Sequence, residues 1–557
     1  MSEQLNEFDG VIIGAGHNAL VLAGYMAKAG LSLAIVEKEA FLGGGCGTAI
    51  SNFVPGFMHE MHSQFHRNIP ATPWYRDLDL GNYGVEYIYP PVNNGMPFSD
   101  GRNLIVHRDP EVTRVAIARF NKRDAERYYE TYHKYRDMAL KIQLLREYSP
   151  PLPPDEEREL LSQSAMGREF LSLNERSAYE VAYDIFEDQA LRAFYVYLFA
   201  VRGYLPAPEA RGTGFSMIAM TYLGNKAMLP KGGSRSLAHG LAFMVSHHGG
   251  RIFLATEVER IILENGRAVG VETTAGRQIR ARKFVASSTD PHQTFERFVG
   301  RDQLDTDVCE ALDNYKYGIE GKSFGVLFAV HAGVHEPPRY ASSDWDQRIN
   351  EAFNLCLGYE TSEAILEHLN QVVEGVPPTT IGLQAACPTI HDPTRAPNGK
   401  HVLLAWQFAP YSLRDGGPEG WDAIKHDYMQ KILARWAEYA PNLDPGAGNI
   451  IYAYPQTPPD TERSLQNMRR GDFHVGALIP SQLGYHRPFP QASGYKTFVD
   501  GLYVTGAGTH PSGNITGAPG YNAAGVIAED LGLDIWWQPT DIRHAWSELA
   551  TSSASAV

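Results

Sequence analysis

The sequence predicts an α/β protein in which a Rossmann-type dinucleotide-binding domain, assembled from discontinuous segments, carries an inserted α+β substrate domain. Two strand-turn-helix units with glycine-rich turns, near residues 14–19 and 506–520, predict the dinucleotide-binding domain. Since they lie close to opposite ends of the chain, this domain is expected to be assembled from separate segments. Between them, residues 111–222 and 305–465 have helical or irregular patterns. The simplest fold that uses both glycine-rich turns places these two blocks in the insertion.

The first strand-turn-helix unit has the residues that a phosphate-binding turn needs. Gly14 permits a tight turn, Gly16 lets the backbone approach a pyrophosphate, and the small Ala19 permits close packing of helix on strand. The N-terminus of the helix favours an anion because its first N–H groups are unpaired. Glu37, which ends the second strand, is placed to accept hydrogen bonds from ribose hydroxyls.

A glycine-rich loop follows Glu37, with glycines at four of the five positions 43–47. Such a run indicates either unusual backbone geometry or a close approach to a neighbouring group. Because the loop directly follows the acid expected at the ribose, we expect its neighbour to be the same cofactor. A flexible surface loop is the alternative interpretation.

Helical patterns open at Asp109-Pro110 and continue to about residue 222. Their aromatic and methionine residues are expected either in the core or in the wall of a cavity for an apolar or aromatic substrate. After a further helix that follows Gly232-Gly233, turn residues predict a three-stranded meander. The expected dinucleotide-binding domain comprises residues 1–110, 223–304 and 466–540, the substrate domain residues 111–222 and 305–465, and the C-terminal tail residues 541–557.

Charge and cysteine content exclude several classes of protein. The net charge is −15 and no Lys/Arg block occurs, so nucleic acid is not an expected partner. The four cysteines lack CxxC spacing, which argues against a disulfide framework or a zinc site and favours a reduced, cytoplasmic location. No run approaches the roughly 18 to 20 apolar residues of a membrane span. Ile535-Trp536-Trp537 has two interpretations, a peripheral membrane contact or packing against a domain.

Six motifs together resemble the phytoene desaturase-like family of FAD-dependent oxidoreductases. In chain order they are GAGHNA, LGGGCGT, PKGGSRSL, TEVERIILENGRAVGVET, SSTDPHQTF and GLYVTGAGTHPSGNITGAPGYNAA. The family includes carotenoid desaturases and ketolases, retinol saturase, and the pyridine nucleotide-disulfide oxidoreductase domain-containing protein 2 group. The resemblance spans essentially the whole chain and implies noncovalently bound FAD.

The resemblance also implies which residues hold FAD. Those expected at the pyrophosphate are Gly14, Gly16, His17, Asn18 and Ala19. Those expected at the adenosine ribose are Glu37 and, close by, Lys38. Those expected along the diphosphate and ribityl chain are Gly43, Gly44, Gly45, Thr48, Gly506 and Gly508, while the backbone of Val258 is expected to face adenine.

The same resemblance places the turn at Gly517 and Ala518 near the flavin ring. A helix begins there, and its N-terminal dipole would stabilise the negative charge of reduced flavin. The sequence has no second GxGxxG unit flanked by strand and helix, so a tightly bound NAD(P) domain is not expected. The expected electron acceptor is therefore oxygen, a quinone or another acceptor.

Candidate catalytic residues are few because the flavin itself performs the redox step. Glu60 and His62 are candidates for polar contacts with flavin or substrate, and His510 is a candidate proton donor or acceptor that alternatively holds its turn by hydrogen bonding. His59, His62 and His66 resemble a metal cluster. No metal is expected, however, because His59 and His62 point to opposite faces of a strand.

The sequence therefore favours an FAD-dependent oxidoreductase that dehydrogenates, or in reverse saturates, an apolar or aromatic small molecule by hydride transfer at flavin N5. One alternative is a flavin amine oxidase that acts on a C–N bond. An alternative of another class is a flavin-bearing interaction protein whose FAD is structural. The substrate, the direction of reaction and the oligomeric state stay open.

Overall fold

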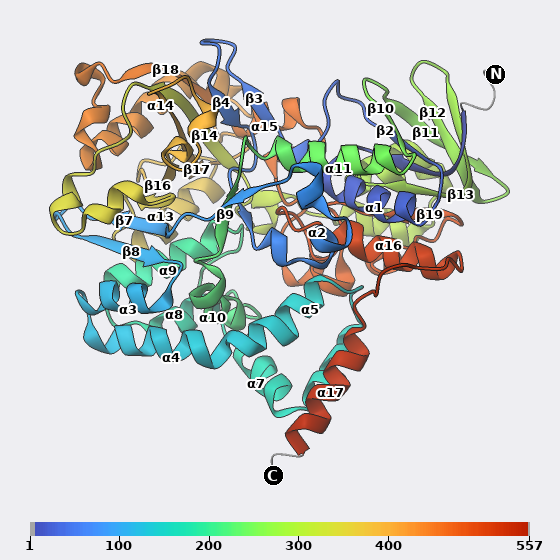
Figure 1. Ribbon diagram of the computed structural model, residues 1–557, viewed down its shortest axis with the longest axis horizontal. Coiled ribbons are helices and arrows are strands. Elements are labelled where there is room, and N and C mark those ends of the chain that lie inside the picture. The colour runs from blue at the N-terminus through green and yellow to red at the C-terminus, as the bar shows by residue number, and fades with distance from the viewer. Residues whose placement is uncertain (1–5, 555–557) are drawn as a thin grey trace.

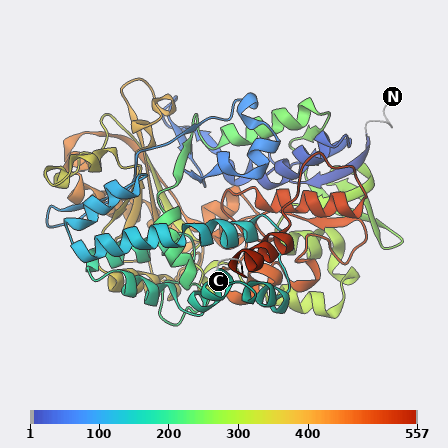
Figure 2. The same ribbon diagram turned by 60° about the horizontal axis from the view of Figure 1, so that its bottom comes forward.

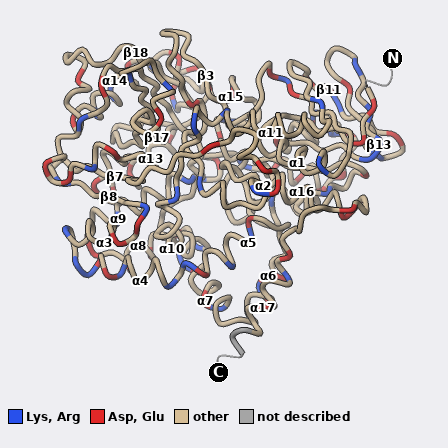
Figure 3. The backbone as a smooth tube through the Cα atoms, viewed as in Figure 1, with Lys and Arg blue, Asp and Glu red and all other residues tan. Residues whose placement is uncertain are grey.

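The computed structural model describes residues 6–554. These residues form two lobes, each built around its own seven-stranded sheet, with a layer of helices beneath the second lobe and a helical arm that ends at the C-terminus (Figure 1). Acidic and basic residues are interspersed over both lobes (Figure 3). No helix among the described residues combines the length and the apolar character needed to cross a membrane.

The first sheet is parallel at its centre and ends in an antiparallel meander. Its strand order is β10-β2-β1-β13-β12-β11, and β19 also pairs with β13. The strands are β1 (Glu7–Ile13), β2 (Leu33–Val36), β10 (Arg251–Phe253), β11 (Val258–Glu264), β12 (Arg267–Thr273), β13 (Gln278–Ser287) and β19 (Leu502–Val504). Strand β19 pairs in parallel with β13, so residues from both ends of the chain complete one sheet. The expected Rossmann-type fold is confirmed.

Three helices pack against one another on one face of this sheet. They are α1 (His17–Lys28), α11 (Arg235–His247) and α16 (Ala518–Asp530), and α1 contacts both of the others. A Cβ atom on Gly520 would lie 2.1 Å from the Asn18 carbonyl oxygen, so the close approach of α16 to α1 requires glycine there. Helix α16 begins at Ala518, and Pro519 is tolerated in its first turn.

The second sheet has the strand order β18-β14-β17-β16-β15-β7-β8. Its strands are β7 (Val92–Pro97), β8 (Asn103–His107), β14 (Leu327–Val334), β15 (Asn354–Leu357), β16 (Leu383–Ala386), β17 (His401–Phe408) and β18 (Ile450–Gln456). Its helices are α12 (Thr306–Asp313), α13 (Ser362–Val373), α14 (Gly420–Tyr439) and α15 (Pro458–Ser464). The expected α+β character of the inserted part is therefore confirmed.

Strands β7 and β8 correct one expected boundary. The sequence assigns residues 1–110 to the dinucleotide-binding domain, whereas β7 pairs in parallel with β15 through Asn94–Asn354 and Gly95–Leu355. Residues 92–107 therefore belong to the second sheet. The alternating pattern of a short strand does not say which sheet the strand will join, because backbone hydrogen bonds to a distant segment decide that.

A helical layer lies beneath the second lobe and reaches the centre of the molecule through α5 (Figure 1). Its members are α3 (Pro110–Ala118), α4 (Lys122–Met138), α5 (Leu144–Glu147), α6 (Pro154–Ser162), α7 (Ala165–Asn174), α8 (Ala178–Ile185), α9 (Gln189–Ala200) and α10 (Gly214–Leu223). Helix α3 begins as predicted, with the Asp109 carboxylate accepting from the Glu111 N–H at 2.9 Å. Tyr195, Phe215 and Met217 are core residues here rather than cavity walls.

Short strands and one short helix lie between the two lobes. β3 (Thr48–Ile50) pairs with β4 (Met58–Glu60), and β9 (Ala227–Pro230) pairs with both β5 (His66–Arg67) and β6 (Tyr87–Ile88). Helix α2 (Pro73–Asp77) follows β5 in the chain. These segments carry the chain between the sheets, and several of their residues reach the site described below.

The C-terminal segment packs in two places. Trp537 is buried, with its ring 4.8 Å from that of Tyr25, and Trp536 stacks on Tyr25 at 5.4 Å, whereas Ile535 is exposed. Farther on, α17 (Ile542–Ala554) lies against α6 and α7 of the helical layer (Figure 2). The Trp546 indole N–H donates to the Lys141 carbonyl oxygen at 3.1 Å and attaches this arm.

Candidate functional site

The turn after β1 leaves no room for a side chain at Gly14. Gly14 has a φ of +92°, and its N–H donates to the Val36 carbonyl oxygen at 2.8 Å. A Cβ atom on Gly14 would lie 2.4 Å from Ser288 Oγ. The glycine-rich loop reaches back to the same place, where the Gly43 N–H donates to the Ala15 carbonyl oxygen at 2.8 Å. Backbone therefore forms the floor of the site.

A cavity of about 160 Å³ lies beside this turn, at the carboxyl ends of β1, β2 and β19. Open parallel sheets bind their ligands at this edge. Of the residues that the sequence predicts for the cofactor, the following line this first cavity: Gly14, Gly16, His17, Asn18, Ala19, Glu37, Lys38, Gly44, Gly45, Val258 and Gly506.

The other predicted cofactor residues lie outside the cavity lining. They are Gly43, Thr48, Gly508, Gly517 and Ala518. The Thr48 hydroxyl donates to the Glu60 carboxylate at 2.8 Å, and a Cβ atom on Gly517 would lie 2.4 Å from the Trp74 ring. Thr48 and Gly517 thus contact Glu60 and Trp74 and do not line the first cavity themselves.

Several lining residues carry no role in the sequence interpretation. Ser288, Thr289, Gln293 and Arg297 follow β13, and Asn467, Met468, Phe473, Val475, Asn514 and Ile515 flank β19. The SSTDP motif directly after a predicted strand could have pointed to the first group, because ligands lie at the carboxyl ends of parallel strands. The second group stands in irregular segments, where no periodic pattern marks it.

Two residues that line the first cavity have polar atoms without a hydrogen-bond partner in the described part of the chain, and these atoms indicate whether a dinucleotide would fit there. His17 Nε2 and Asn18 Oδ1 are buried without a hydrogen-bond partner among the described residues. Burial lowers the pKa of His17 to about 4, so its ring is neutral at pH 7. Buried polar atoms are nearly always paired in folded proteins. Both residues begin α1, where phosphate oxygens are favoured, so the residues present fit a bound dinucleotide.

Glu37 is held in place by backbone groups. Its carboxylate accepts hydrogen bonds from the Ala15 N–H at 2.7 Å and from the Glu39 N–H at 2.9 Å. Burial nevertheless raises the pKa of Glu37, because desolvation outweighs these bonds. An ionised carboxylate has about four acceptor positions, so Glu37 retains capacity for ribose hydroxyls.

A second cavity, of about 190 Å³, adjoins the first. The two cavities share the wall residues Gly45, Met468, Phe473, Asn514 and Ile515. The apolar part of the second wall comes from segments 65–73, 139–148 and 201–226 and from the second sheet, and it includes Phe65, Leu140, Leu144, Val201, Leu223, Leu327 and Trp406. A molecule in the second cavity therefore lies directly next to one in the first.

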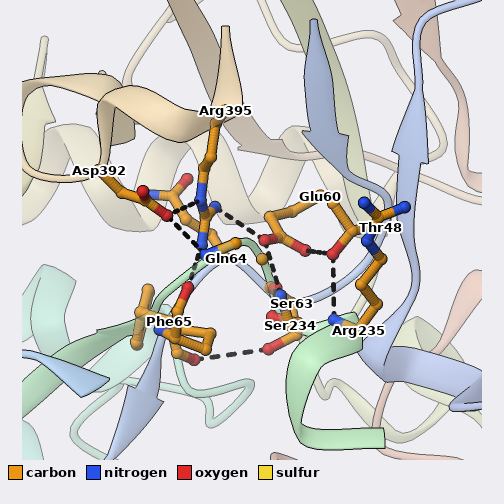
Figure 4. Close-up of polar contacts among 12 residues, drawn as sticks. Thr48, Glu60, Ser63, Gln64, Phe65, Ser234, Arg235, Asp392 and Arg395 are labelled. Carbon is orange, nitrogen blue, oxygen red and sulfur yellow. Dashed lines mark hydrogen bonds and ion pairs between the residues drawn. The ribbon is translucent and has the colours of Figure 1, made fainter. Parts of the chain in front are cut away.

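Among the candidate catalytic residues, His62 lines the second cavity. Burial lowers its pKa to about 4, so the ring is neutral at pH 7. Glu60 instead makes a buried ion pair with Arg395 at 2.7 Å and accepts from the Ser234 N–H at 2.9 Å (Figure 4). It lines neither cavity. Glu60 joins the β3-β4 hairpin to the second lobe.

His510 also lies outside the lining of both cavities. Its Nε2 bonds to the Arg146 carbonyl oxygen at 2.6 Å, and its own carbonyl oxygen accepts from the Tyr495 hydroxyl at 2.7 Å. These bonds agree with the interpretation in which His510 holds its turn. His59 bonds to the Tyr452 hydroxyl at 2.7 Å, and no group of three or more potential ligands for a metal ion occurs among residues 6–554.

Comparison with known proteins identifies the family. The model of the flavin containing amine oxidoreductase family matches residues 20–520. The chain belongs to this family. One subunit of the limonene dehydrogenase of Castellaniella defragrans is 33% identical over 556 residues, which cover 97% of this chain and 98% of that protein. The expected FAD-dependent oxidoreductase activity and the FAD cofactor are thereby confirmed.

More distant relatives support the same conclusion. Pyridine nucleotide-disulfide oxidoreductase domain-containing protein 2 of Rattus norvegicus is 26% identical and covers 94% of each chain. The resemblance to the phytoene desaturase-like group is confirmed. Wild-type putrescine oxidase has the same fold, with a TM-score of 0.56 at 16% identity, and covers 99% of each chain.

Proposed function

We propose that this flavoenzyme dehydrogenates a small, mainly apolar molecule held in the second cavity. The observation that carries the proposal is the shared wall of the two cavities, formed by Gly45, Met468, Phe473, Asn514 and Ile515. This wall allows a molecule in the second cavity to contact a cofactor in the first. The name of the relative from Castellaniella defragrans, a limonene dehydrogenase, also supports an apolar substrate.

The first cavity is proposed to hold FAD. Gly14, Gly16 and the N-terminus of α1 would receive the pyrophosphate, with the His17 ring donating to it, and Glu37 would accept from the ribose. Val258 would face adenine through its backbone. The residues of the shared wall would then lie beside the flavin ring.

In this reaction the substrate gives up one hydrogen as hydride and a second as a proton. Bound FAD supplies the hydride acceptor at its N5 atom. His62 is the proposed proton acceptor, since it lines the second cavity and is neutral above its lowered pKa of about 4. The apolar wall, including Val201 and Trp406, would exclude water and orient the reacting C–H bond.

Amine oxidation is the second candidate function, favoured by the family description and by the fold shared with putrescine oxidase. The charge of the second cavity opposes it. Arg67 and Arg202 line this cavity, and two guanidinium groups disfavour a cationic amine in a site of low dielectric. Dehydrogenation of a substrate without an ammonium group therefore agrees better with the residues present.

Anaerobic spectroscopy of the purified holoenzyme tests the proposed function. Five compounds are added in turn to the oxidised protein: a cyclic terpene, a polyene, an aromatic alcohol, a cyclic carboxylic acid and a primary amine. We expect the flavin absorbance to bleach with one of the first four, and oxygen or a quinone to restore it. Bleaching by the amine alone would support the second candidate, and no bleaching with any compound of the first four classes would contradict the proposal.

A further inference from the structure

Charged side chains line the second cavity beside its apolar wall. Arg67 ends β5, Arg202 follows α9, Lys226 precedes β9, and Glu147 ends α5. Four separate segments thus bring three cations and one acid to a single cavity. Neither arginine lines the first cavity, so the two guanidinium groups belong to the substrate side of the shared wall.

Arg67 has no anionic partner in the protein. Its Nε atom is buried without a hydrogen-bond partner, and no carboxylate of the described residues forms an ion pair with its guanidinium group. Its aromatic contact is with the Phe65 ring, whose centroid lies 4.9 Å from the guanidinium carbon. Burial lowers the pKa of Arg67 to about 9, and the charge of Arg202 adds to this effect. The group therefore lies where its charge is poorly stabilised.

Arg202 is half-buried at the same cavity. Its guanidinium donates to the Met220 sulfur at 3.9 Å, which is a weak acceptor. Glu147 lies in its electrostatic field, but the described residues include no ion pair within 4.0 Å between them, and burial raises the pKa of Glu147. Lys226 directs its ammonium group to the Tyr132 hydroxyl at 3.3 Å. The cavity therefore has an excess of positive charge even when Glu147 is ionised.

Two fully buried arginines show how the same chain satisfies a guanidinium group. Arg395 pairs with Glu60 and with Asp392, at 2.7 and 3.1 Å. Arg487 donates to backbone carbonyl oxygens, among them those of His474 at 2.6 Å and Ala507 at 2.9 Å. A charge held away from water without a partner is costly. Arg67 and Arg202 are half-buried at the cavity and have no comparable partners among residues 6–554, which indicates that an anion from outside the chain binds there.

We propose that the second cavity binds a small organic acid, with its carboxylate between Arg67 and Arg202 and its apolar body against Val201, Leu223 and Trp406. A guanidinium fork matches a carboxylate in geometry and charge. The inference rests on the proposed function, because it names the substrate class of the same cavity. It distinguishes this chain from relatives whose names indicate a hydrocarbon substrate.

Binding of matched probes to the oxidised holoenzyme tests this inference. The probes are cyclohexanecarboxylate, its neutral counterpart cyclohexanecarboxamide, limonene and inorganic phosphate, and binding is measured by calorimetry and by perturbation of the flavin spectrum. We expect the carboxylate to bind about tenfold more tightly than the amide, the difference for a charge-assisted hydrogen bond. Arg67→Gln should remove this preference, and Arg67→Lys should retain part of it.

Arg414→Gln is the matched control, because Arg414 is exposed and far from the cavity lining. It should leave the preference for the carboxylate unchanged. Three results would each overturn the inference. They are equal binding of the carboxylate and the amide, binding of limonene that is tighter than that of the carboxylate, and complete displacement of the carboxylate by inorganic phosphate. A carboxylate that binds tightly without bleaching the flavin under anaerobic conditions supports the anion site and counts against dehydrogenation of that ligand. Bleaching of the flavin by limonene, with no preference of the protein for the carboxylate over the amide, would support dehydrogenation and count against the anion site.

Discussion

Gly14 and Gly30 have nearly the same positive φ but different surroundings. A Cβ atom on Gly14 would meet Ser288, whereas one on Gly30 would have no atom within 4 Å. We expect Gly30→Ala to cost about 1–2 kcal/mol from backbone strain. Gly14→Ala should cost on the order of 1–3 kcal/mol more from overpacking and should also reduce bound FAD. Unfolding in denaturant and the ratio of flavin to protein absorbance measure both effects.

Gly30→Ala is the control for Gly14→Ala, since it carries the same backbone strain at a distance from the cavity. Its flavin content should match that of the wild type. Equal flavin content in both variants would contradict the assignment of the pyrophosphate to the turn at Gly14.

Glu37 provides a second test at the scale of the residue. Its carboxylate lines the first cavity and is oriented by the Ala15 and Glu39 backbone. We expect Glu37→Ala to weaken FAD binding by roughly tenfold to a hundredfold, the loss of charge-assisted hydrogen bonds of about 1.5–3 kcal/mol. Glu264→Ala, an exposed acid in the same sheet, is the control. Wild-type FAD affinity in the Glu37 variant would refute the proposed ribose contact.

At the scale of elements, one buried ion pair joins the second lobe to the short strands between the lobes. Arg395 follows β16 in the second lobe, and its guanidinium bonds to Glu60 of β4 and to the Pro230 carbonyl oxygen at the end of β9. Removing one partner leaves a buried charge without compensation. We expect Arg395→Met to lower the free energy of unfolding by about 3–5 kcal/mol.

The double variant Glu60→Gln with Arg395→Met separates the lost pairing from the stranded charge. It should be more stable than Arg395→Met alone, because no uncompensated carboxylate remains at residue 60. Denaturant unfolding of both variants checks the order of stability. A double variant that is less stable than the single one would show that Glu60 has another role.

Elements also show what the sequence can predict. The two glycine-rich turns predict the central sheet because their residue types are tied to tight turns and phosphate contacts. The Asp109 cap and Pro110 likewise predict the start of α3. In contrast, β7 and β8 join the second sheet through backbone pairing with Asn354 and Leu355, which lie far along the chain. Local patterns carry no information about such a partner.

At the scale of the molecule, the site was only partly predictable for the same reason. Gly14, Gly16 to Ala19 and Glu37 belong to local motifs and line the first cavity. The second cavity is assembled from several separate segments, and its residues Arg67, Arg202 and Met468 belong to no motif. Glu60 and His510 carry plausible chemistry, but packing directs Glu60 to Arg395 and His510 to the Arg146 carbonyl oxygen.

Buried histidines make the whole fold sensitive to acid. Burial lowers the pKa of eight histidines to about 3 or 4, namely His17, His59, His62, His66, His331, His368, His474 and His510. In the unfolded chain each takes up a proton near pH 6.5, so their stabilising contribution is full above that pH. It is lost as pH falls from 6.5 toward 4, by at most about 1.4 kcal/mol per pH unit for each histidine.

The free energy of unfolding measured at pH 7, 6 and 5 checks this sensitivity. We expect a steady decrease from pH 7 to pH 5, with loss of bound flavin. The raised pKa values of five acids act in the opposite direction, since their contribution is lost as pH rises, but the eight histidines outnumber them. These acids are Glu37, Glu60, Asp124, Glu147 and Asp472. His368→Gln should make the decrease less steep. Stability that is constant or higher at pH 5 would contradict the account.

The central claim is that substrate in the second cavity reduces FAD in the first. Val201→Trp places a large ring in the second cavity, and Val115→Trp, at an exposed position of α3, is its control. The decisive measurement is the anaerobic rate of flavin reduction by the substrate that bleaches the wild type. We predict normal FAD content in both variants and reduction slowed by an order of magnitude or more only in Val201→Trp, because a displacement of about 1 Å costs roughly a hundredfold in rate. Reduction at the wild-type rate in a Val201→Trp protein that retains FAD would contradict the claim.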